Sequence, residues 1–176
     1  MYFPPQNQMP PSRFTDPVQA VRTMQIVCAA LMMGVLMFAG AAIFMRFGPG
    51  GQVPAAQPMV AYMAAGMAAL MIVARLVVVP FVIKGGIKQL TATTPLDDVA
   101  KLDFYGVYQT QMIVGCALLE GAAFFNLISF IVEGQIWTLG IVAVLLAIMA
   151  TAFPTLERVG SWAEEQLRML RLDPPN

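Results

Sequence analysis

Apolar residues fall into four long runs along the chain, separated by short polar or Gly/Pro-rich segments. The runs cover about residues 24–45, 59–83, 111–132 and 136–153. Each reaches the about 17–25 apolar residues with which an α-helix crosses a bilayer. The pattern therefore predicts an all-α membrane protein in which four transmembrane helices form a bundle over residues 16–154.

The segments that flank these runs are polar. Residues 1–15 are rich in Pro and Gln, and we expect them to be disordered. Asp16–Pro17 and Thr94–Pro95 each pair an N-cap residue with proline at the first helical position, which is typical of a helix start. The loop 133–135 is so short that the third and fourth helices must pack as an antiparallel pair.

Residues 155–176 form an amphipathic tail. Ser161 and Glu164 match a capping box, so we expect the tail helix to begin there. Its apolar stripe favours a helix on the membrane surface, with Trp162 as the interfacial anchor. Docking of a partner protein is the alternative interpretation of the same stripe.

Lysine and arginine are distributed asymmetrically between the two sides of this layout. With four spans, one side holds both termini and the middle loop, and the opposite side holds only Arg46. Positive charge marks the cytoplasmic side, which predicts cytoplasmic termini. The charges of that side are Arg13, Arg22, Lys84, Lys88, Lys101, Arg158, Arg168 and Arg171.

Composition supports the membrane assignment and narrows the function. The 176 residues are 59% hydrophobic and 11% charged, with a net charge of zero and no histidine. A neutral chain gives no sign of nucleic-acid binding. Without histidine, and without a nucleophile–base pair or a ligand cluster, the sequence indicates no enzyme, cofactor or metal site.

The first and third runs resemble each other when the chain is shifted by 87 residues. Seven positions, from Thr23/Thr110 to Phe38/Phe125, are then identical. Two parallel hairpin repeats are one explanation, and chance identity between two segments of mostly apolar residues is the other.

Small residues spaced by four are expected to let the helices approach closely. These are Ala61, Ala65 and Ala69, then Ala117 with Gly121, and Ala143 with Ala147.

Two charges lie inside the predicted spans. Arg75 lies about 12 Å from the Ile83 end of the second span, and Glu120 lies about 14 Å from the Gln111 end of the third. A charge at membrane depth costs ~2.5–3.5 kcal/mol on insertion scales, so both are candidate site residues. A structural ion pair is the favoured interpretation, and an ion or proton relay is the alternative. Asn126 and Ser129, further along the third span, are candidates for polar contacts between helices.

The third span, QMIVGCALLEGAAFFNLISFIV, resembles the carboxylate-bearing helix of the proteolipid c subunits of rotary ATPases. In that family a small-residue helix carries one acidic residue that binds the transported proton or sodium ion. The resemblance implies that role for Glu120, within ALLEGAA. It covers about an eighth of the chain, and Arg75 has no counterpart in the family pattern.

Methionines recur every four residues in the second span, at positions 59, 63, 67 and 71. Thioether sulfur suits Cu(I), and MxxxM resembles the motif of high-affinity copper transporters. Methionine is also a flexible filler of irregular gaps, so we interpret these four methionines, the methionine ladder, as a packing face.

Cys28 and Cys116 lie in apolar runs and are expected to be free thiols.

These observations predict a small multi-pass membrane protein that acts by helix–helix association as a structural or accessory subunit. Its expected partners are the lipid bilayer and other membrane protein copies or subunits. The alternative is a transporter or an ion-conducting subunit that uses Arg75 and Glu120.

Overall fold

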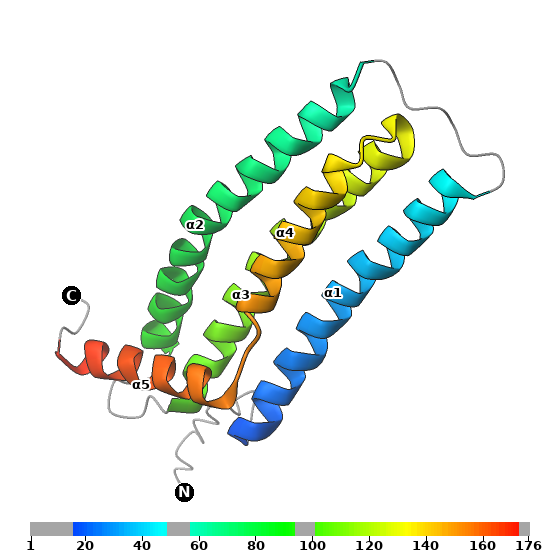
Figure 1. Ribbon diagram of the computed structural model, residues 1–176. Helices are drawn as coiled ribbons and strands as arrows, with labels where there is room; N and C mark the ends of the chain where they lie inside the picture. Colours follow the sequence, from blue (N-terminus) through cyan, green and yellow to red (C-terminus); the bar gives the residue numbers. More distant parts are fainter. Residues whose placement is uncertain (1–15, 49–56, 94–100, 173–176) are drawn as a thin grey trace, which may run out of the picture.

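The computed structural model describes residues 16–48, 57–93 and 101–172, and these ranges contain helices and no strand (Figure 1). The N-terminal segment and the Thr94–Pro95 helix start lie outside the described residues. Asp16 caps the first helix as predicted, because its side chain accepts a hydrogen bond from Val18 N at 3.0 Å. The helices are α1 (Pro17–Phe47), α2 (Met59–Thr93), α3 (Lys101–Glu133), α4 (Trp137–Thr151) and α5 (Leu156–Leu172).

The described helices support an integral membrane protein with three or four spans. By length and apolarity α1, α2 and α3 can each cross a bilayer. The fourth predicted span is shorter than expected, since α4 has 15 residues. At a rise of about 1.5 Å per residue it covers about 22 Å of a hydrocarbon core about 30 Å thick. A fourth crossing is complete only when α4 is counted together with α5, to which it is joined at a bend of 65°.

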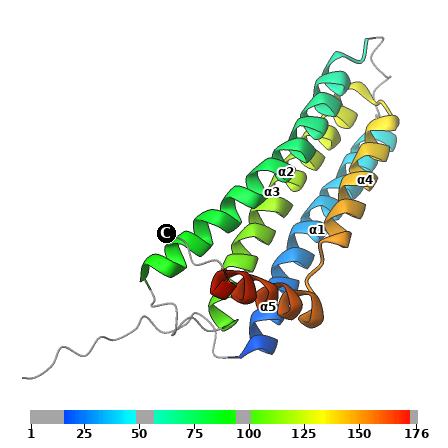
Figure 2. The same cartoon turned by 90° about the vertical axis from the view of Figure 1, so that its left-hand side faces the viewer.

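The first four helices alternate in direction, and α5 lies across one end of the bundle (Figures 1 and 2). We call this end the α5 end and the opposite end the far end. Helix α3 packs against α1, α2, α4 and α5. Half of its most apolar stretch is buried, compared with 17% for α1 and 6% for α2. The core of the protein is therefore built around α3.

The two halves of the chain do not form equivalent hairpins. Helices α3 and α4 pack directly, whereas α1 and α2 lie on opposite sides of α3 and share little contact (Figure 1). The prediction of two parallel hairpin repeats is therefore wrong in its packing. Although the first and third spans have similar sequences, α1 does not pack against α2 as α3 packs against α4, because α3 lies between α1 and α2.

Alanines form the inner face of α2, but not all of those predicted. Ala61, Ala64 and Ala68 are buried, whereas Ala65 is half-buried and Ala69 is exposed. A spacing of three then four follows the 3.6-residue turn of a straight helix, which a strict spacing of four does not. These small side chains let α2 approach α3 closely.

The other predicted small-residue faces point outward. Ala117 and Gly121 of α3 and Ala143 and Ala147 of α4 are all exposed in the described structure. Most of the methionine ladder of α2 is exposed as well, with Met59 at 72% and Met63 at 64% of full exposure. Met67 is also exposed, whereas Met71 is half-buried and packs against the core. The interpretation of the ladder as a packing face inside the protein therefore holds only for Met71, and lipid is the expected neighbour of the other three.

Glu133, at the end of α3, caps the start of α2. Its two carboxylate oxygens accept hydrogen bonds from Val60 N at 2.7 Å and Ala61 N at 2.8 Å. The residue before α2 is Pro58, whose side chain has no oxygen to cap the helix. A carboxylate supplied by another helix satisfies these free N–H groups and lies at the positive end of the helix dipole.

Gly134 completes the far end of the bundle. Its φ of +70° is the left-handed conformation that glycine adopts at a helix C-terminus, and its N–H donates to Phe130 O at 2.8 Å. The guanidinium of Arg46, the last basic residue of α1, occupies the space that a side chain at Gly134 would need. The ends of α1 and α3 therefore meet at a residue without a side chain.

The junction of α4 and α5 is fixed by its own polar groups. Pro154 stops α4, and its carbonyl accepts a hydrogen bond from Gln25 of α1 at 2.9 Å. Thr155 then caps α5, since its hydroxyl accepts from Arg158 N at 3.3 Å. The predicted start at Ser161 is wrong. Ser161 lies inside the helix and its hydroxyl donates to Arg158 O, because the Pro154–Thr155 pair offers an earlier helix start.

Helix α5 is attached to the first turns of α3. The ring of Trp162 packs edge-on against Tyr108 at 5.3 Å and Phe104 at 6.5 Å between centroids. Lys101 Nζ lies 2.5 Å from the carboxylate of Glu164, and this hydrogen bond raises the pKa of Lys101 above its ordinary value of 10.5. Trp162, predicted as a lipid anchor, is half-buried and contacts α3 in the described structure.

Adjacent glycines of α2 offer a matched test of the α2–α3 contact. A Cβ at Gly86 would lie 2.8 Å from Val107 of α3, whereas a Cβ at Gly85 would meet nothing within 4 Å. Val107 is β-branched and cannot turn away freely in a helix. We expect Gly86→Ala to lower the free energy of unfolding by about 1–3 kcal/mol. Gly85→Ala should be neutral or raise it by up to about 1 kcal/mol. Thermal unfolding in detergent measures both, and equal effects would contradict the close contact.

The cap on α2 predicts a cost for Glu133→Ala. Glu133 is only 4% exposed, so the substitution leaves the N–H groups of Val60 and Ala61 without a partner at a buried position. We expect a loss of about 1–3 kcal/mol in the free energy of unfolding, as for other lost charged caps. Glu165→Ala is the control, because Glu165 forms only a surface ion pair with Arg168 and should change stability by less than about 0.5 kcal/mol. A silent Glu133→Ala would show that the cap contributes nothing.

Candidate functional site

The two charges within the spans lie on different faces of α3. Arg75 of α2 packs against Gly115, where a Cβ would lie 3.6 Å from Arg75 Nε. Glu120 approaches Gly34 of α1, where a Cβ would lie 3.5 Å from Glu120 Oε1. Residues five apart on a helix are rotated by about 140°. Among the described residues, Arg75 and Glu120 therefore form no ion pair with each other.

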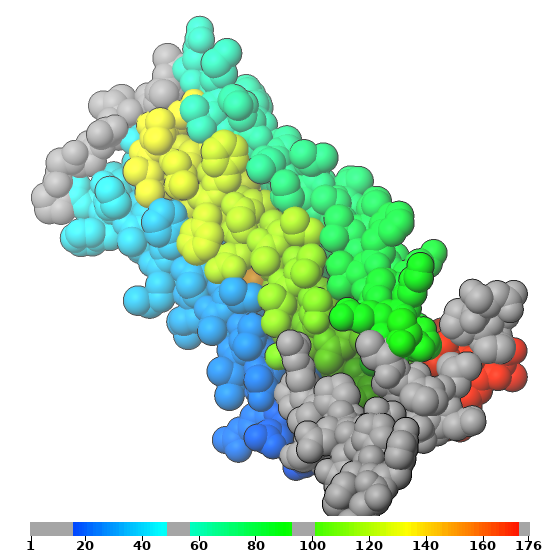
Figure 3. Space-filling model, turned by 180° about the vertical axis from the view of Figure 1, so that it is seen from behind, coloured from blue at the N-terminus to red at the C-terminus, as the bar shows by residue number. Residues whose placement is uncertain are grey.

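Glu120 has a small-residue environment with no cation. It is half-buried at the edge of α3, beside Gly34 and next to the exposed pair Ala117 and Gly121. Within the described ranges its carboxylate accepts no hydrogen bond and joins no salt bridge. Figure 3 shows that α3 is open to the surroundings between α1 and α2. Among the described residues, the carboxylate of Glu120 is left available to a further group.

Arg75 lines a polar cavity of about 200 Å³ close to the α5 end. A second arginine, Arg158 at the start of α5, lines the same cavity, together with Tyr108 and Gln111 of α3. The residues that form its wall include no carboxylate. Arg75 Nη1 and Gln111 Oε1 are buried and have no hydrogen-bond partner in the described structure.

The depth of Arg75 differs from the estimate made from sequence. That estimate measured from Ile83, but α2 continues through Pro80 to Thr93. Measured from Met59, at the far end, Arg75 lies about 24 Å along the helix. This is close to the about 22 Å length of α4, which explains why Arg75 meets the α4–α5 junction and Arg158. In a hydrocarbon core about 30 Å thick, Arg75 is near the boundary on the α5 side.

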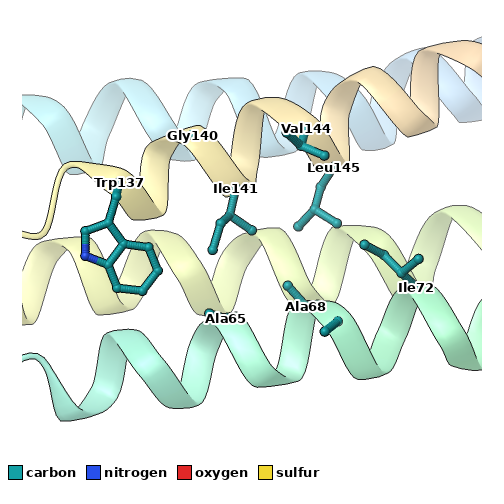
Figure 4. Close-up of a pocket in the computed structure, with 9 residues that line it drawn as sticks. Ala65, Ala68, Ile72, Trp137, Gly140, Ile141, Val144 and Leu145 are labelled. Atoms are coloured by element: carbon teal, nitrogen blue, oxygen red, sulfur yellow. The ribbon is translucent and has the colours of Figure 1, made fainter.

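An apolar groove of about 390 Å³ lies between α2 and α4, further along α2 toward the far end. The side chains of Trp137, Ile141 and Leu145 extend from α4 toward α2, where Ala68 and Ile72 face them (Figure 4). The ring of Trp137 stacks at 5.9 Å on Tyr62 of α2. The groove has no charged residue in its wall.

Asn126 and Ser129 differ in their contacts. Asn126 Nδ2 donates to Ala64 O of α2 at 3.1 Å and to Ala122 O of its own helix at 2.9 Å. It is therefore a polar contact between α2 and α3. Ser129 is fully buried, but its hydroxyl has no partner in the part of the chain that the structure describes.

The two cysteines meet between α1 and α3. Cys28 and Cys116 are buried, not joined by a disulfide, and their thiols interact with each other. Within the described ranges, no group of three or more acidic or thiol side chains is arranged to hold a metal ion. The thiol pair therefore adds to the contact between α1 and α3.

The neighbours of Arg75 in this cavity were not predicted from the sequence. They are Arg158, Tyr108 and Gln111. From the sequence, Arg158 was predicted only to be a cytoplasmic charge and Gln111 only to begin the third span. Pro154 could have indicated that Arg158 lies near Arg75, because it shortens α4 and so brings Arg158 toward the level of Arg75.

No protein-family model matches the chain, and neither a curated protein nor a solved structure is significantly similar to it.

Asn126 and Ser129 provide a paired test of buried polar contacts. Asn126→Ala removes the hydrogen bond to Ala64 and should lower the free energy of unfolding by about 1 kcal/mol, which is typical inside membranes. Ser129→Ala removes a buried hydroxyl that has no partner, so the change should be neutral or stabilising. Thermal unfolding of both variants in the same detergent measures the two changes in stability. A larger loss from Ser129→Ala than from Asn126→Ala would contradict the described contacts.

Proposed function

We propose that this protein is an accessory subunit of a membrane complex and binds a transmembrane helix of another protein through the open face of α3. The observation that carries the proposal is the unpartnered carboxylate of Glu120 on a face of small residues. Carboxylates at membrane depth are costly and are normally paired. A partner helix that donates a hydrogen bond or carries a positive charge would remove that cost.

The open face has the composition of a helix-packing surface. Ala117 and Gly121 are exposed beside Glu120, and larger apolar residues, Ile113 and Ile128, flank them along the same side of α3. Small residues let two backbones approach, and van der Waals packing then drives association in lipid. Among the described helices, those that pack against α3 leave part of its surface open between α1 and α2 (Figure 3).

A different protein fits this face better than a second copy does. A two-fold contact through α3 would bring two Glu120 carboxylates close together, and like charges repel in a medium of low dielectric constant. Arg75, the other charge within the spans, points to another side of α3 and is no counter-charge for that contact.

We propose cytoplasmic termini for the assembled protein. The α5 end carries the basic excess of the chain, and the far end carries Arg46. In this orientation α5 lies at the inner membrane surface, held to α3 by Trp162 and by the Lys101–Glu164 pair. Glu164 keeps the pKa of Lys101 above 10.5, so this link persists throughout the neutral range.

Photo-crosslinking in native membranes tests the proposal. A crosslinking residue at Gly121 should form an adduct with one membrane protein other than a second copy. The same residue at Val73, which is 56% exposed on α2, should yield only lipid adducts. Glu120→Ala should reduce the Gly121 adduct several-fold without lowering thermal stability, because Glu120 has no partner inside the described chain. Adducts with lipid alone, or with a second copy, would contradict the proposal.

Ion or proton binding by Glu120 is the second candidate function, and the same unpartnered carboxylate supports it. It is the role implied by the resemblance to proteolipid c subunits, here without Arg75, which lines a different cavity. A hydrophobic carbodiimide should then label Glu120, and sodium ions or protons should change the labelling rate. Glu133 is an internal control, since two hydrogen bonds from α2 occupy its carboxylate. Labelling insensitive to both cations would exclude this role.

A further inference from the structure

The wall of the polar cavity carries two positive charges and no negative one. Arg75 and Arg158 face it from α2 and α5, and Tyr108 and Gln111 add groups that can donate hydrogen bonds. Two guanidinium groups on one cavity repel each other. A buried N–H without an acceptor, such as Arg75 Nη1, adds a desolvation cost.

The rest of the chain offsets only part of this charge. Arg158 Nη1 donates to Thr151 O at 2.5 Å, at the C-terminal end of α4. That end of a helix carries about half a negative charge, against two full positive charges. Arg75 makes no comparable bond within the described residues. An anion with several oxygen acceptors would satisfy both arginines, and phosphate matches the guanidinium fork.

The apolar groove lies next to this cavity along α2, on the side of the far end. Ile72 lines the groove one turn from Arg75 on α2, and the groove extends along α2 to Ala65. The distance from residue 75 to residue 65 is about 15 Å along the helix, which is half the hydrocarbon thickness. The positive pocket near the membrane boundary and the apolar groove together thus extend about as far as one leaflet is thick.

We propose that α2, α4 and α5 form a binding site for one anionic phospholipid from the leaflet on the α5 side. Its phosphate binds between Arg75 and Arg158, and an acyl chain lies along Ala68, Ile72 and Ile141. A lipid fits better than a free anion because the apolar groove, between α2 and α4, begins one turn along α2 from the polar cavity. This lipid site is separate from the open face of α3 and does not depend on the proposed partner.

The test uses the purified full-length chain, stripped of lipid in a non-ionic detergent. Phosphatidylglycerol and phosphatidylcholine with identical acyl chains are titrated, and retained lipid is counted by native mass spectrometry. The wild-type chain should bind one phosphatidylglycerol at least about tenfold more tightly than phosphatidylcholine. Arg75→Gln should lose about tenfold in affinity for phosphatidylglycerol only, which corresponds to one lost charged hydrogen-bonding group. Arg75→Lys should retain part of the preference, since it keeps the charge without the fork.

Two control variants separate this site from general lipid coating. Arg168→Gln removes an exposed arginine of the same tail helix and should leave both affinities unchanged. Gly140→Leu adds a side chain in the groove, where a Cβ meets nothing within 4 Å. It should weaken both lipids equally and preserve the ratio of their affinities. If Arg75→Gln and Arg168→Gln behave alike, the lipid coats the surface and the proposal is wrong.

Stability and competition complete the test. Without lipid, Arg75→Gln should be at least as thermally stable as the wild-type chain, because it removes an unpaired buried cation. Phosphatidylglycerol should raise the unfolding temperature of the wild-type chain more than that of Arg75→Gln. A variant less stable than the wild type in the absence of lipid would assign Arg75 a structural role instead. Displacement of phosphatidylglycerol by millimolar inorganic phosphate would show a free-anion site, and either result would overturn the proposal.

Discussion

Every other helix of the described structure is held in place by its contact with α3. In lipid, apolar side chains gain little by leaving their surroundings, so association depends on close packing and on polar contacts between helices. Helix α3 supplies both, with buried Gly115, Ala122 and Ala123 along its length and Asn126 and Glu133 on the side of α2. Because α1 and α2 share little contact, their relative position is set mainly through α3, with smaller contacts from α4.

The residues of α3 that contact α2 most closely follow a single face, which explains why Glu120 has no partner on α2. Gly115, Asn126 and Glu133 are separated by eleven and seven residues, spacings that return to nearly the same direction on a helix. That face meets α2, which brings the carbonyl of Ala64 to Asn126 and two N–H groups to Glu133. Glu120 is rotated away from this face and cannot use the groups that α2 offers.

Helix positions could be predicted from sequence more readily than helix contacts. Apolar run length located α1, α2 and α3, and the Asp16–Pro17 pair located the start of α1. The apolar runs do not indicate which side of each helix faces the core, because the side that faces lipid and the side that faces the core are equally apolar. The methionine ladder and the Ala117–Gly121 pair were therefore assigned to packing within the chain, yet Met59, Met63 and Met67 and both small residues are exposed. The cap from Glu133 to α2 joins residues 73 positions apart, and no local pattern in either segment specifies it.

The short length of α4 determines the chemistry of the α5 end. Pro154 ends α4 about one turn before a full crossing, and Gln25 of α1 holds the Pro154 carbonyl at that level. Helix α5 must then begin near the depth of Arg75, so Arg158 joins Arg75 at one cavity. A fourth span of full length would carry Arg158 out toward water, where its charge would need no partner. The same stop that shortens the span thus brings two positive charges to one cavity, and the proposed lipid site depends on helix length as much as on the arginines themselves.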